Sequence, residues 1–286
     1  MSLQYWFMLP VSVLVATVAM ASGVEGATFF TPLFVLALGL PVEVAVGTGL
    51  ITEFFGFASG LYAYYRKRLI DYRLGGQLLL VTVPMALVGT WLSARIEPDI
   101  LKVILGMGLL AVAASFLRTP ESKDVARMDD AIAEEFGGER AETCLITAAG
   151  EEIRYKVCNR GEGGLISGVG AVFMGMISTG LGELNAYFLL QRCRVPSSVS
   201  VATSVLVVAF TALTAASGHL YQFIQVGGET LDTVLSLIVF TVPGVIVGGQ
   251  LGSAVASLVS QTVLERSLGV LFLVIAALMI GQVIIA

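Results

Sequence analysis

The sequence contains very little charge outside one short segment. Lys, Arg, Asp and Glu make up only 13% of the 286 residues, and 18 of the 37 charged residues lie between positions 118 and 162. Hydrophobic residues account for 56% and the mean hydropathy is +0.89, whereas soluble proteins contain about 45–50% apolar residues. This composition excludes an ordinary soluble protein and predicts an integral membrane protein.

Metal ligands, basic clusters and catalytic groups are also scarce. The chain has one histidine and three cysteines, and no two cysteines are close enough in sequence to suggest a zinc or haem motif. We therefore expect no metal and no cofactor. No stretch is basic enough to bind nucleic acid, and no nucleophile–base set suggests an enzyme. No Lys or Arg precedes the first apolar run, so this run is not expected to be a signal peptide.

Apolar runs of membrane-spanning length are abundant. A helix needs about 20 apolar residues to cross a bilayer. Two apolar regions, residues 3–40 and 163–191, are interrupted by glycine-rich breaks. We expect an all-α polytopic protein with two repeated halves of about four helices each, and a broken helix or re-entrant hairpin at the start of each half. The uninterrupted runs lie near residues 43–65, 75–94, 99–117, 197–217, 231–257 and 263–285.

The two breaks are versions of one motif. The first has the sequence SGVEGA over residues 22–27, and the second has STGLGELN over residues 178–185. Each is followed by a proline, Pro41 or Pro196, and then by a segment with the pattern Val-x-Thr. A carboxylate among glycines in an apolar run is costly in a membrane and usually marks the path of an ion or substrate. Two copies in matching halves are typical of a transporter.

Further matches between the halves indicate an internal duplication. The matches occur in the same order along both halves, at an offset of 155 residues early in each half and of 159 residues later. Chance matches are common in a sequence so rich in Gly, Val and Leu, but ordered matches favour duplication. The matched positions include Pro41 and Pro196, Thr48 and Thr203, Pro84 and Pro243, and Gly89 and Gly248.

The distribution of Lys and Arg bears on the topology of the halves. Basic residues concentrate at 66–73, in the charged segment, and at Arg192 and Arg194, and such clusters favour cytoplasmic loops. If both broken segments crossed the membrane fully, Arg192 and Arg194 would lie opposite the other clusters. Re-entrant hairpins would place all three clusters on one side and leave three full crossings in each half. Because three is odd, the halves would then be inverted, which is the arrangement we favour.

The charged segment separates the two halves. We divide the chain into a first membrane repeat at 1–117, a cytoplasmic linker at 118–162 and a second membrane repeat at 163–286. Within the linker, residues 124–136 have the pattern of a short amphipathic helix, and residues 142–157 alternate like a β-hairpin. The linker is too short for an enzyme domain. It is a simple connection between the halves or, alternatively, a regulatory or dimerising element.

The breaks supply groups that bind an oxyanion. Glycines allow a helix to unwind, and the freed N–H groups at the start of the next half-helix attract an anion. In lipid these groups would have no partner, so they must line a cavity or be buried in protein. We expect the two breaks to face each other around one small anion. The candidate substrate-binding residues are Gly26, Thr28, Gly47, Thr48, Thr179, Gly180, Gly182, Asn185, Thr203 and Ser204.

Three glutamates are candidates for proton coupling. Glu25 and Glu183 lie within the breaks, and Glu53 lies in the apolar run that follows the first break. A carboxylate in an apolar cavity favours its protonated form and can therefore carry a proton. Alternatively, Glu25 and Glu183 each cap the N–H groups of their own break, and Glu53 makes an interhelical hydrogen bond. His219, the single histidine, is expected to be an interfacial anchor rather than a proton relay.

The paired breaks resemble a known family. Glycine-rich breaks followed by a proline and a Val-x-Thr segment are similar to those of the TauE/SafE sulfite exporter family, and residues 178–185 with 202–204 are the most specific part. The resemblance covers both membrane halves and leaves out the linker. It implies proton-coupled transport of sulfite, sulfonates or related sulfur-containing anions in a bacterial inner membrane. The first half departs from the denser glycines of the family motif, because Val24 and Glu25 interrupt them.

These observations together predict a secondary transporter. We expect it to move a small sulfur oxyanion or organosulfonate across the cytoplasmic membrane by alternating access about the two breaks. The expected partners are this anion, protons and membrane lipid, with a second copy of the chain as a candidate. An anion channel or uncoupled anion permease built on the same halves is the alternative. A membrane-embedded enzyme or assembly factor is the least favoured class.

Overall fold

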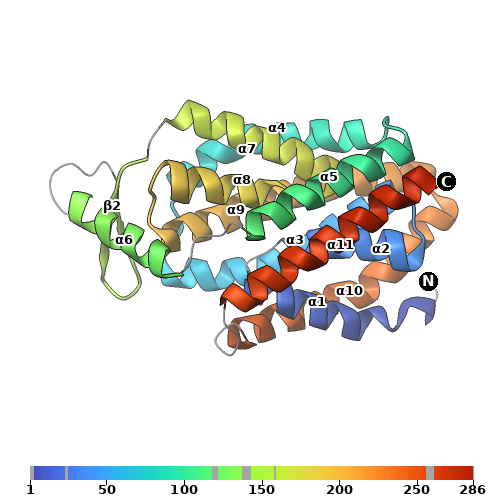
Figure 1. Ribbon diagram of the computed structural model, residues 1–286, viewed down its shortest axis with the longest axis horizontal. Coiled ribbons are helices and arrows are strands. Elements are labelled where there is room, and N and C mark those ends of the chain that lie inside the picture. The colour runs from blue at the N-terminus through green and yellow to red at the C-terminus, as the bar shows by residue number, and fades with distance from the viewer. Residues whose placement is uncertain are drawn as a thin grey trace.

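The apolar runs form α-helices that lie roughly along one common axis, as the computed structural model shows (Figure 1). The described residues are all-α apart from one small hairpin between the halves. Gly23 and Val24 of the first break lie outside the residues that the structure describes. The described residues are 3–22, 25–117, 122–136, 143–157, 159–255 and 261–285.

The helices and strands of the described residues fall into three groups along the chain. The first group follows a 3₁₀ turn at Leu3–Tyr5 and consists of α1 (Met8–Ser22), α2 (Ala27–Leu38), α3 (Val42–Lys67), α4 (Tyr72–Ser93) and α5 (Pro98–Leu117). The middle group consists of α6 (Ser122–Phe136), β1 (Thr143–Ile146) and β2 (Glu152–Tyr155). The last consists of α7 (Arg160–Ile177), α8 (Leu181–Ala186) with a π-helical continuation (Tyr187–Arg192), α9 (Ser197–Val226), α10 (Gly228–Val255) and α11 (Gln261–Ile285).

Six of the described helices are long and apolar enough to cross a membrane: α3, α4, α5, α9, α10 and α11. They correspond to the six uninterrupted apolar runs, so the prediction of a polytopic all-α membrane protein is confirmed. The predicted end of α9 near residue 217 was wrong, because the helix continues to Val226. Gly218 packs against Thr90 instead of ending the helix, which stops at Gly227 with a φ of 62°.

Each broken segment enters the bundle and returns toward the end from which it came. In Figure 1, α1 runs inward from the end at which the N-terminus lies and α2 returns toward it, whereas α7 enters from the opposite end and α8 runs back. In the second of these hairpins, a Cβ atom added to Gly163 of α7 would collide with the ring of Phe188. Glycine at this position therefore allows the two arms of the hairpin to touch.

Close glycine contacts join helices from different halves. α1 packs against α10, α4 against α7, and α5 against α11. Gly248 of α10 lies against the carbonyl oxygen of Val13, and Gly89 of α4 lies against the carbonyl oxygen of Val172. Because glycine has no side chain, the backbones of these helices can approach each other closely. The first helix of each half is thus packed against the fourth helix of the other half.

The linker module, which consists of α6, β1 and β2, is attached to one end of the bundle. The two strands are antiparallel, with Thr143 opposite Tyr155. The buried hydroxyl of Tyr155 donates a hydrogen bond to Asp71 Oδ2 at 2.7 Å. Asp129 of α6 accepts hydrogen bonds from the backbone N–H and the hydroxyl of Ser197. The module therefore contacts the α3–α4 connection of the first half and the start of α9 in the second.

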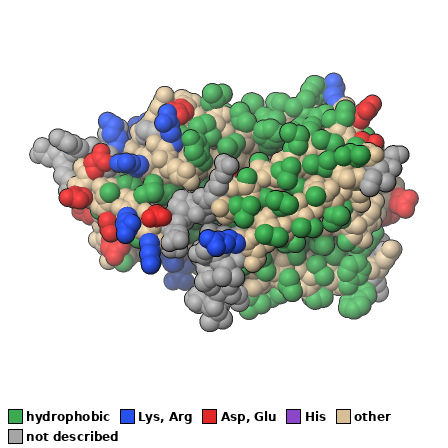
Figure 2. Space-filling view, viewed as in Figure 1, with side chains coloured by type: hydrophobic (Ala, Val, Ile, Leu, Met, Phe, Trp, Pro, Cys, Tyr) green, Lys and Arg blue, Asp and Glu red, His purple; other side chains and the backbone are tan. Residues whose placement is uncertain are grey.

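The basic clusters adjoin this module. The carbonyl oxygen of Lys67 accepts a hydrogen bond of 3.0 Å from the β1–β2 turn. Arg192 is paired with Glu162 at 2.9 Å, and Arg194 with Glu135 at 3.6 Å. Figure 2 shows charged side chains gathered at this end and mainly hydrophobic side chains over the helices. The clusters therefore lie on one side of the apolar helices.

Two of the cysteines are described by the structure. Cys144 on β1 is free and exposed. Cys193, near the start of α9, is in a disulfide, which the spacing of cysteines along the sequence did not suggest. Cys158 lies outside the described residues.

Candidate functional site

The first break joins α1 to α2 and contains Glu25 and Gly26. Gly26 precedes α2 and supplies no side chain that could cap the helix. The cap comes from α3, because Glu53 Oε1 accepts a hydrogen bond from the N–H of Ala27 at 3.2 Å. Glu53 therefore satisfies a backbone group that the break leaves without a partner in its own helix.

The second break, from Ser178 to Gly180, joins α7 to α8. Both residues have positive φ, 60° and 109°, a conformation that glycine adopts at little cost. The hydroxyls of Ser178 and Thr31 share a hydrogen bond of 2.5 Å, which links this break to α2. Glu183 Oε2 accepts a hydrogen bond from the N–H of Gly180 at 3.1 Å. In this conformation Glu183 therefore caps the N–H of Gly180 in its own break.

The two breaks also contact each other directly. Glu25 Oε1 accepts a hydrogen bond from the N–H of Gly182 at 2.5 Å. Beside this contact, Thr28 Oγ1 donates to Thr179 Oγ1 at 3.1 Å. A Cβ atom added to Gly182 would lie only 2.6 Å from Glu25 Oε1, so this contact depends on glycine. The Glu25 carboxylate thus accepts a hydrogen bond from the N–H of Gly182, which a bound anion could otherwise use.

Three carboxyl groups surround the contact between the breaks. Glu25 and Glu53 are only 3% and 2% exposed, and all three, including Glu183, lie near enough to interact electrostatically. None of the ion pairs found among the described residues involves them. Buried like charges without a counter-charge repel strongly. Charge balance at the site therefore requires protons or a bound cation.

Asn185 lies on α8, just beyond the second break, and is fully buried. Its Oδ1 accepts a hydrogen bond from the hydroxyl of Ser167 at 2.6 Å. Its Nδ2 has no hydrogen-bond partner among the described residues. Since buried donors are nearly always paired in folded proteins, this amide is a candidate donor to a further group at the site.

The predicted binding residues do not all gather at one place. Thr48 donates to a carbonyl of its own helix, and the adjacent Gly47 packs against His219. Thr203 instead accepts a hydrogen bond from the N–H of Asp71 at 3.0 Å, beside the linker module. Thr203 and His219 are 16 residues apart on α9, about 24 Å at 1.5 Å per residue. Thr48 and Thr203 therefore lie toward opposite ends of the bundle.

The structure thus divides the candidate residues into two sets. Those gathered at the breaks are Glu25, Gly26, Thr28, Glu53, Thr179, Gly180, Gly182, Glu183 and Asn185. Those that lie elsewhere are Gly47, Thr48, Thr203 and Ser204.

His219 is fully buried, so the prediction of an interfacial anchor was wrong. Its Nε2 makes a hydrogen bond of 2.9 Å with the carbonyl of Gly175, and its ring lies against that of Phe223. The cause is the greater length of α9, which continues to Val226 and keeps position 219 inside the bundle.

Sequence reasoning also missed the Thr31–Ser178 hydrogen bond. The only available signal was that both residues are small hydroxyl residues close to a break. Hydroxyl residues are common throughout this chain, and several of them bond within their own helix, as Thr90 and Thr214 do. Proximity to a break was therefore too weak a signal to pair the two residues.

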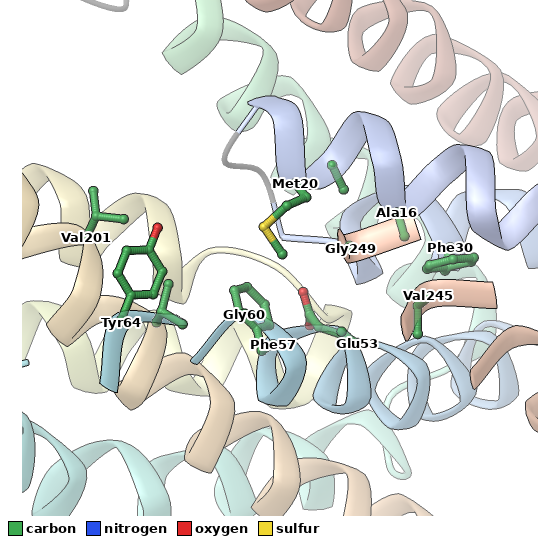
Figure 3. Close-up of a pocket in the computed structure, with 14 residues that line it drawn as sticks. Ala16, Met20, Phe30, Glu53, Phe57, Gly60, Tyr64, Val201, Val245 and Gly249 are labelled. Atoms are coloured by element: carbon green, nitrogen blue, oxygen red, sulfur yellow. The ribbon is translucent and has the colours of Figure 1, made fainter. Parts of the chain in front are cut away.

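A cavity of about 120 Å³ adjoins the breaks, between α1, α2, α3, α9 and α10. Figure 3 shows the carboxylate of Glu53 pointing into it and Tyr64 and Val201 at its other end. Tyr64 is in the last turn of α3 and Val201 in the second turn of α9. The cavity therefore extends from the first break toward the end of the bundle that carries the linker module.

The sequence that forms these two hairpins matches a known protein family. A family model described as sulfite exporter TauE/SafE matches residues 8–279. The chain belongs to the TauE/SafE family. The match spans both breaks, five of the six membrane-spanning helices and most of α11. A relative of this TauE/SafE protein is the probable membrane transporter protein YunE of Bacillus subtilis (strain 168).

YunE is 24% identical over 213 residues, which cover 74% of this chain and 71% of YunE. No solved structure matches the chain. The TauE/SafE family and this relative identify a multi-pass membrane transporter for a small anion, not an enzyme. Within the described ranges, no group of three or more His, Cys, Asp or Glu residues could hold a metal ion.

Proposed function

We propose that this TauE/SafE protein is a secondary transporter that moves sulfite, an organosulfonate or a related small sulfur-containing anion across the cytoplasmic membrane. Transport is coupled to protons and proceeds by alternating access. The observation that carries the proposal is the direct contact between two broken hairpins, Glu25 to Gly182 and Thr28 to Thr179. Broken helices that meet inside the membrane form the substrate sites of many secondary transporters.

A small oxyanion finds suitable donors at this contact, and two of them are held by glutamates in the present conformation. An anion that enters must therefore compete with a carboxylate for the same N–H groups. A protonated carboxyl group competes less strongly, because charged acceptors form the stronger hydrogen bonds. Proton uptake by these carboxyl groups therefore favours anion binding, and anion binding favours proton uptake. The candidate donors are the N–H groups of Ala27 and Gly182, the hydroxyls of Thr28 and Thr179, and the amide of Asn185.

Reciprocal contacts support two inverted halves. Thr52 of α3 shares a hydrogen bond of 2.8 Å with Thr241 of α10, and Thr211 of α9 shares one of 2.9 Å with Thr82 of α4. Each residue of one pair lies 159 positions from its counterpart in the other, the same offset that relates Gly89 to Gly248. Two halves that make equivalent contacts in opposite orientations can exchange conformations, which is the basis of alternating access.

The bundle is more open on one side than on the other. The cavity next to Glu53 extends toward the linker module. At the opposite end Gly47 packs so closely against His219 and Phe223 that an added Cβ would lie 2.5 to 2.7 Å from their atoms. This asymmetry fits one of the two end states of an alternating-access cycle, in which the site faces the side of the module.

Flux through proteoliposomes tests the proposal. With labelled sulfite and short alkyl sulfonates, we expect the wild-type protein to concentrate an anion when a pH gradient is imposed. Thr179→Val removes a hydrogen bond between the breaks and is expected to slow flux about five- to tenfold, as for the loss of about 1 kcal/mol. Thr214→Val is the control, because Thr214 is exposed and bonds only within its own helix.

Two results would contradict this function. Failure of the wild-type protein to move any sulfur anion would remove the assigned substrate class. Flux that never exceeds the equilibrium distribution would favour the channel or uncoupled permease instead.

A further inference from the structure

The three glutamates at the breaks differ in what their oxygens contact. Glu25 accepts a hydrogen bond from the N–H of Gly182, and Glu183 accepts one from Gly180, so both are tied to the second break. Neither is among the described residues that line the cavity, whereas Glu53 is. Glu53 is therefore the carboxyl group of this cluster that borders an open space.

One oxygen of Glu53 is held and the other is not. Glu25 Oε2 is likewise without a partner among the described residues, but Glu25 does not line the cavity. In Glu53, Oε1 accepts the hydrogen bond from Ala27 and Oε2 has no partner among the described residues, although the side chain is only 2% exposed. Figure 3 shows the carboxylate directed into the cavity. A buried, unpaired carboxylate oxygen is costly while it carries charge. A proton on this oxygen removes the charge and leaves Oε1 to accept from Ala27.

The described lining of the cavity offers no basic side chain that could neutralise Glu53. Metal cations need several oxygen ligands, and the lining supplies few, so a proton suits the site better than a metal ion. The other ionisable groups around Glu53 and the cavity are Glu25 in the first break, Glu183 on α8, and Tyr64 on α3 at the far end of the cavity. The lining residues from α1, α9 and α10 are Ala16, Ala19, Met20, Val201, Val205, Val245 and Gly249.

A route for the proton leads from the module side. The cavity continues from Glu53 past Gly60 to Tyr64, and its volume of about 120 Å³ has room for several water molecules. It is narrow at Gly60, where an added Cβ would lie 3.2 Å from the Met20 side chain. A file of water molecules in this cavity would connect Glu53 with Tyr64 on the module side, whereas the Gly47–His219 contact closes the other end.

We propose that Glu53 is the group that takes up the coupling proton, on Oε2, from the module side through this cavity. The assignment rests on the proposed proton-coupled transport. Protonation weakens Oε1 as an acceptor, so an entering anion can displace it from the N–H of Ala27. After the change of access, the proton leaves from Oε2 on the opposite side. Glu25 and Glu183 hold the second break in place during the cycle.

Glu53→Gln tests this role, because glutamine keeps the shape and an acceptor for Ala27 but cannot exchange a proton. With one proton per anion, a gradient of one pH unit should give about tenfold accumulation in the wild type. The Glu53→Gln variant should show a ratio near one, the same with and without the gradient. Glu43→Gln, at the start of the same helix and outside the site, is the matched control and should accumulate like wild type.

A second measurement does not depend on transport. The infrared band of protonated carboxyl groups should be present in the wild type and should lose the contribution of one carboxyl group in Glu53→Gln. Gly60→Leu fills the narrow part of the cavity and should slow hydrogen–deuterium exchange of this band. Gly76→Leu, at a position with open space on α4, should leave the exchange rate unchanged.

The outcomes separate this proposal from the proposed function. If the band behaves as expected but no sulfur anion is transported, the proton site stands and the substrate assignment fails. If the band keeps its full intensity in Glu53→Gln, or the variant still accumulates anion in response to the pH gradient, Glu53 is not the coupling group. Loss of the wild-type band on titration with sodium would show a metal cation at the site and overturn the proposal.

Discussion

Gly182 is the residue at which the two breaks come closest. Its N–H group donates to Glu25, and the space that a side chain would need is taken by the Glu25 carboxylate. A glycine in a membrane helix is often interpreted as a source of flexibility. Here the lack of a side chain instead permits a specific contact between residues 157 positions apart in the sequence.

Gly182→Ala should therefore disturb the site. The added methyl group would lie 2.6 Å from Glu25 Oε1, and overpacking of this kind costs about 1–3 kcal/mol. We expect a lower melting temperature in detergent and slower anion flux. Gly164→Ala on α7 is the control, because its Cβ would make an ordinary 3.5 Å contact with Val81. Equal melting temperatures for the two variants would show that the Glu25–Gly182 contact is not tight.

At the scale of elements, the linker module is more than a covalent connection. Two aspartates join it to the membrane helices. Asp71 caps the start of α4 and accepts a hydrogen bond from the hydroxyl of Tyr155. Asp129 accepts a hydrogen bond from the N–H of Ser197 at the start of α9. Asp71 also donates its backbone N–H to Thr203. The module therefore contacts both halves at the end toward which the cavity extends, where the proposed change of access would require movement.

The Tyr155–Asp71 contact predicts a pH dependence. Burial raises the pKa of Tyr155, and the hydrogen bond to Asp71 and the charge of Asp71 raise it further. Unfolded tyrosine titrates near pH 10, so the stability from this contact is fully present below about pH 10 and is lost as the pH rises toward the folded-state pKa. We expect alkaline release of the module, measured by limited proteolysis between neutral pH and about pH 11.

Tyr155→Phe tests the same contact. The variant should be less stable at neutral pH by about 1–2 kcal/mol, since Asp71 Oδ2 loses its donor, and the tyrosine-dependent part of the alkaline transition should disappear. Tyr221→Phe, at an exposed tyrosine on α9, serves as the control. An unchanged alkaline transition in Tyr155→Phe would exclude Tyr155 as its source.

At the scale of the whole molecule, the side of the membrane on which the linker module lies sets the orientation of every helix. Lys and Arg residues gather at this end, which favours the cytoplasm. Cys193, however, is in a disulfide, and disulfides are typical of oxidising compartments outside the cytoplasm. The two signals favour opposite sides of the membrane, and labelling of an exposed residue decides between them.

Cys144 offers such a measurement because it is free and exposed on β1. We expect a membrane-impermeant thiol reagent to label it in inside-out vesicles and not in intact cells. A Cys144→Ser variant shows how much of the labelling comes from this residue. Labelling of Cys144 in intact cells would place the module outside the cytoplasm and reverse the orientation of the cavity.

Local sequence patterns were sufficient to predict the class of protein and the order of helices and breaks along the chain. Apolar length alone located the six membrane-spanning helices, because the cost of burying polar groups in lipid applies to each segment separately. Glycines among apolar residues indicated where both breaks lie, because a local glycine-rich sequence allows a helix to unwind. The TauE/SafE resemblance followed from the same motifs, and the family match over residues 8–279 confirms it.

The partners of each site residue depended on the three-dimensional arrangement. Thr48 and Thr203 occupy the same place in their motifs, yet they lie toward opposite ends of the bundle. Glu53 lies outside both motifs, yet it caps the first break and borders the cavity. Helical periodicity describes neighbours within one segment, whereas these contacts arise because two hairpins enter the bundle from opposite ends. Their meeting point is set by how distant helices pack, which no local pattern contains.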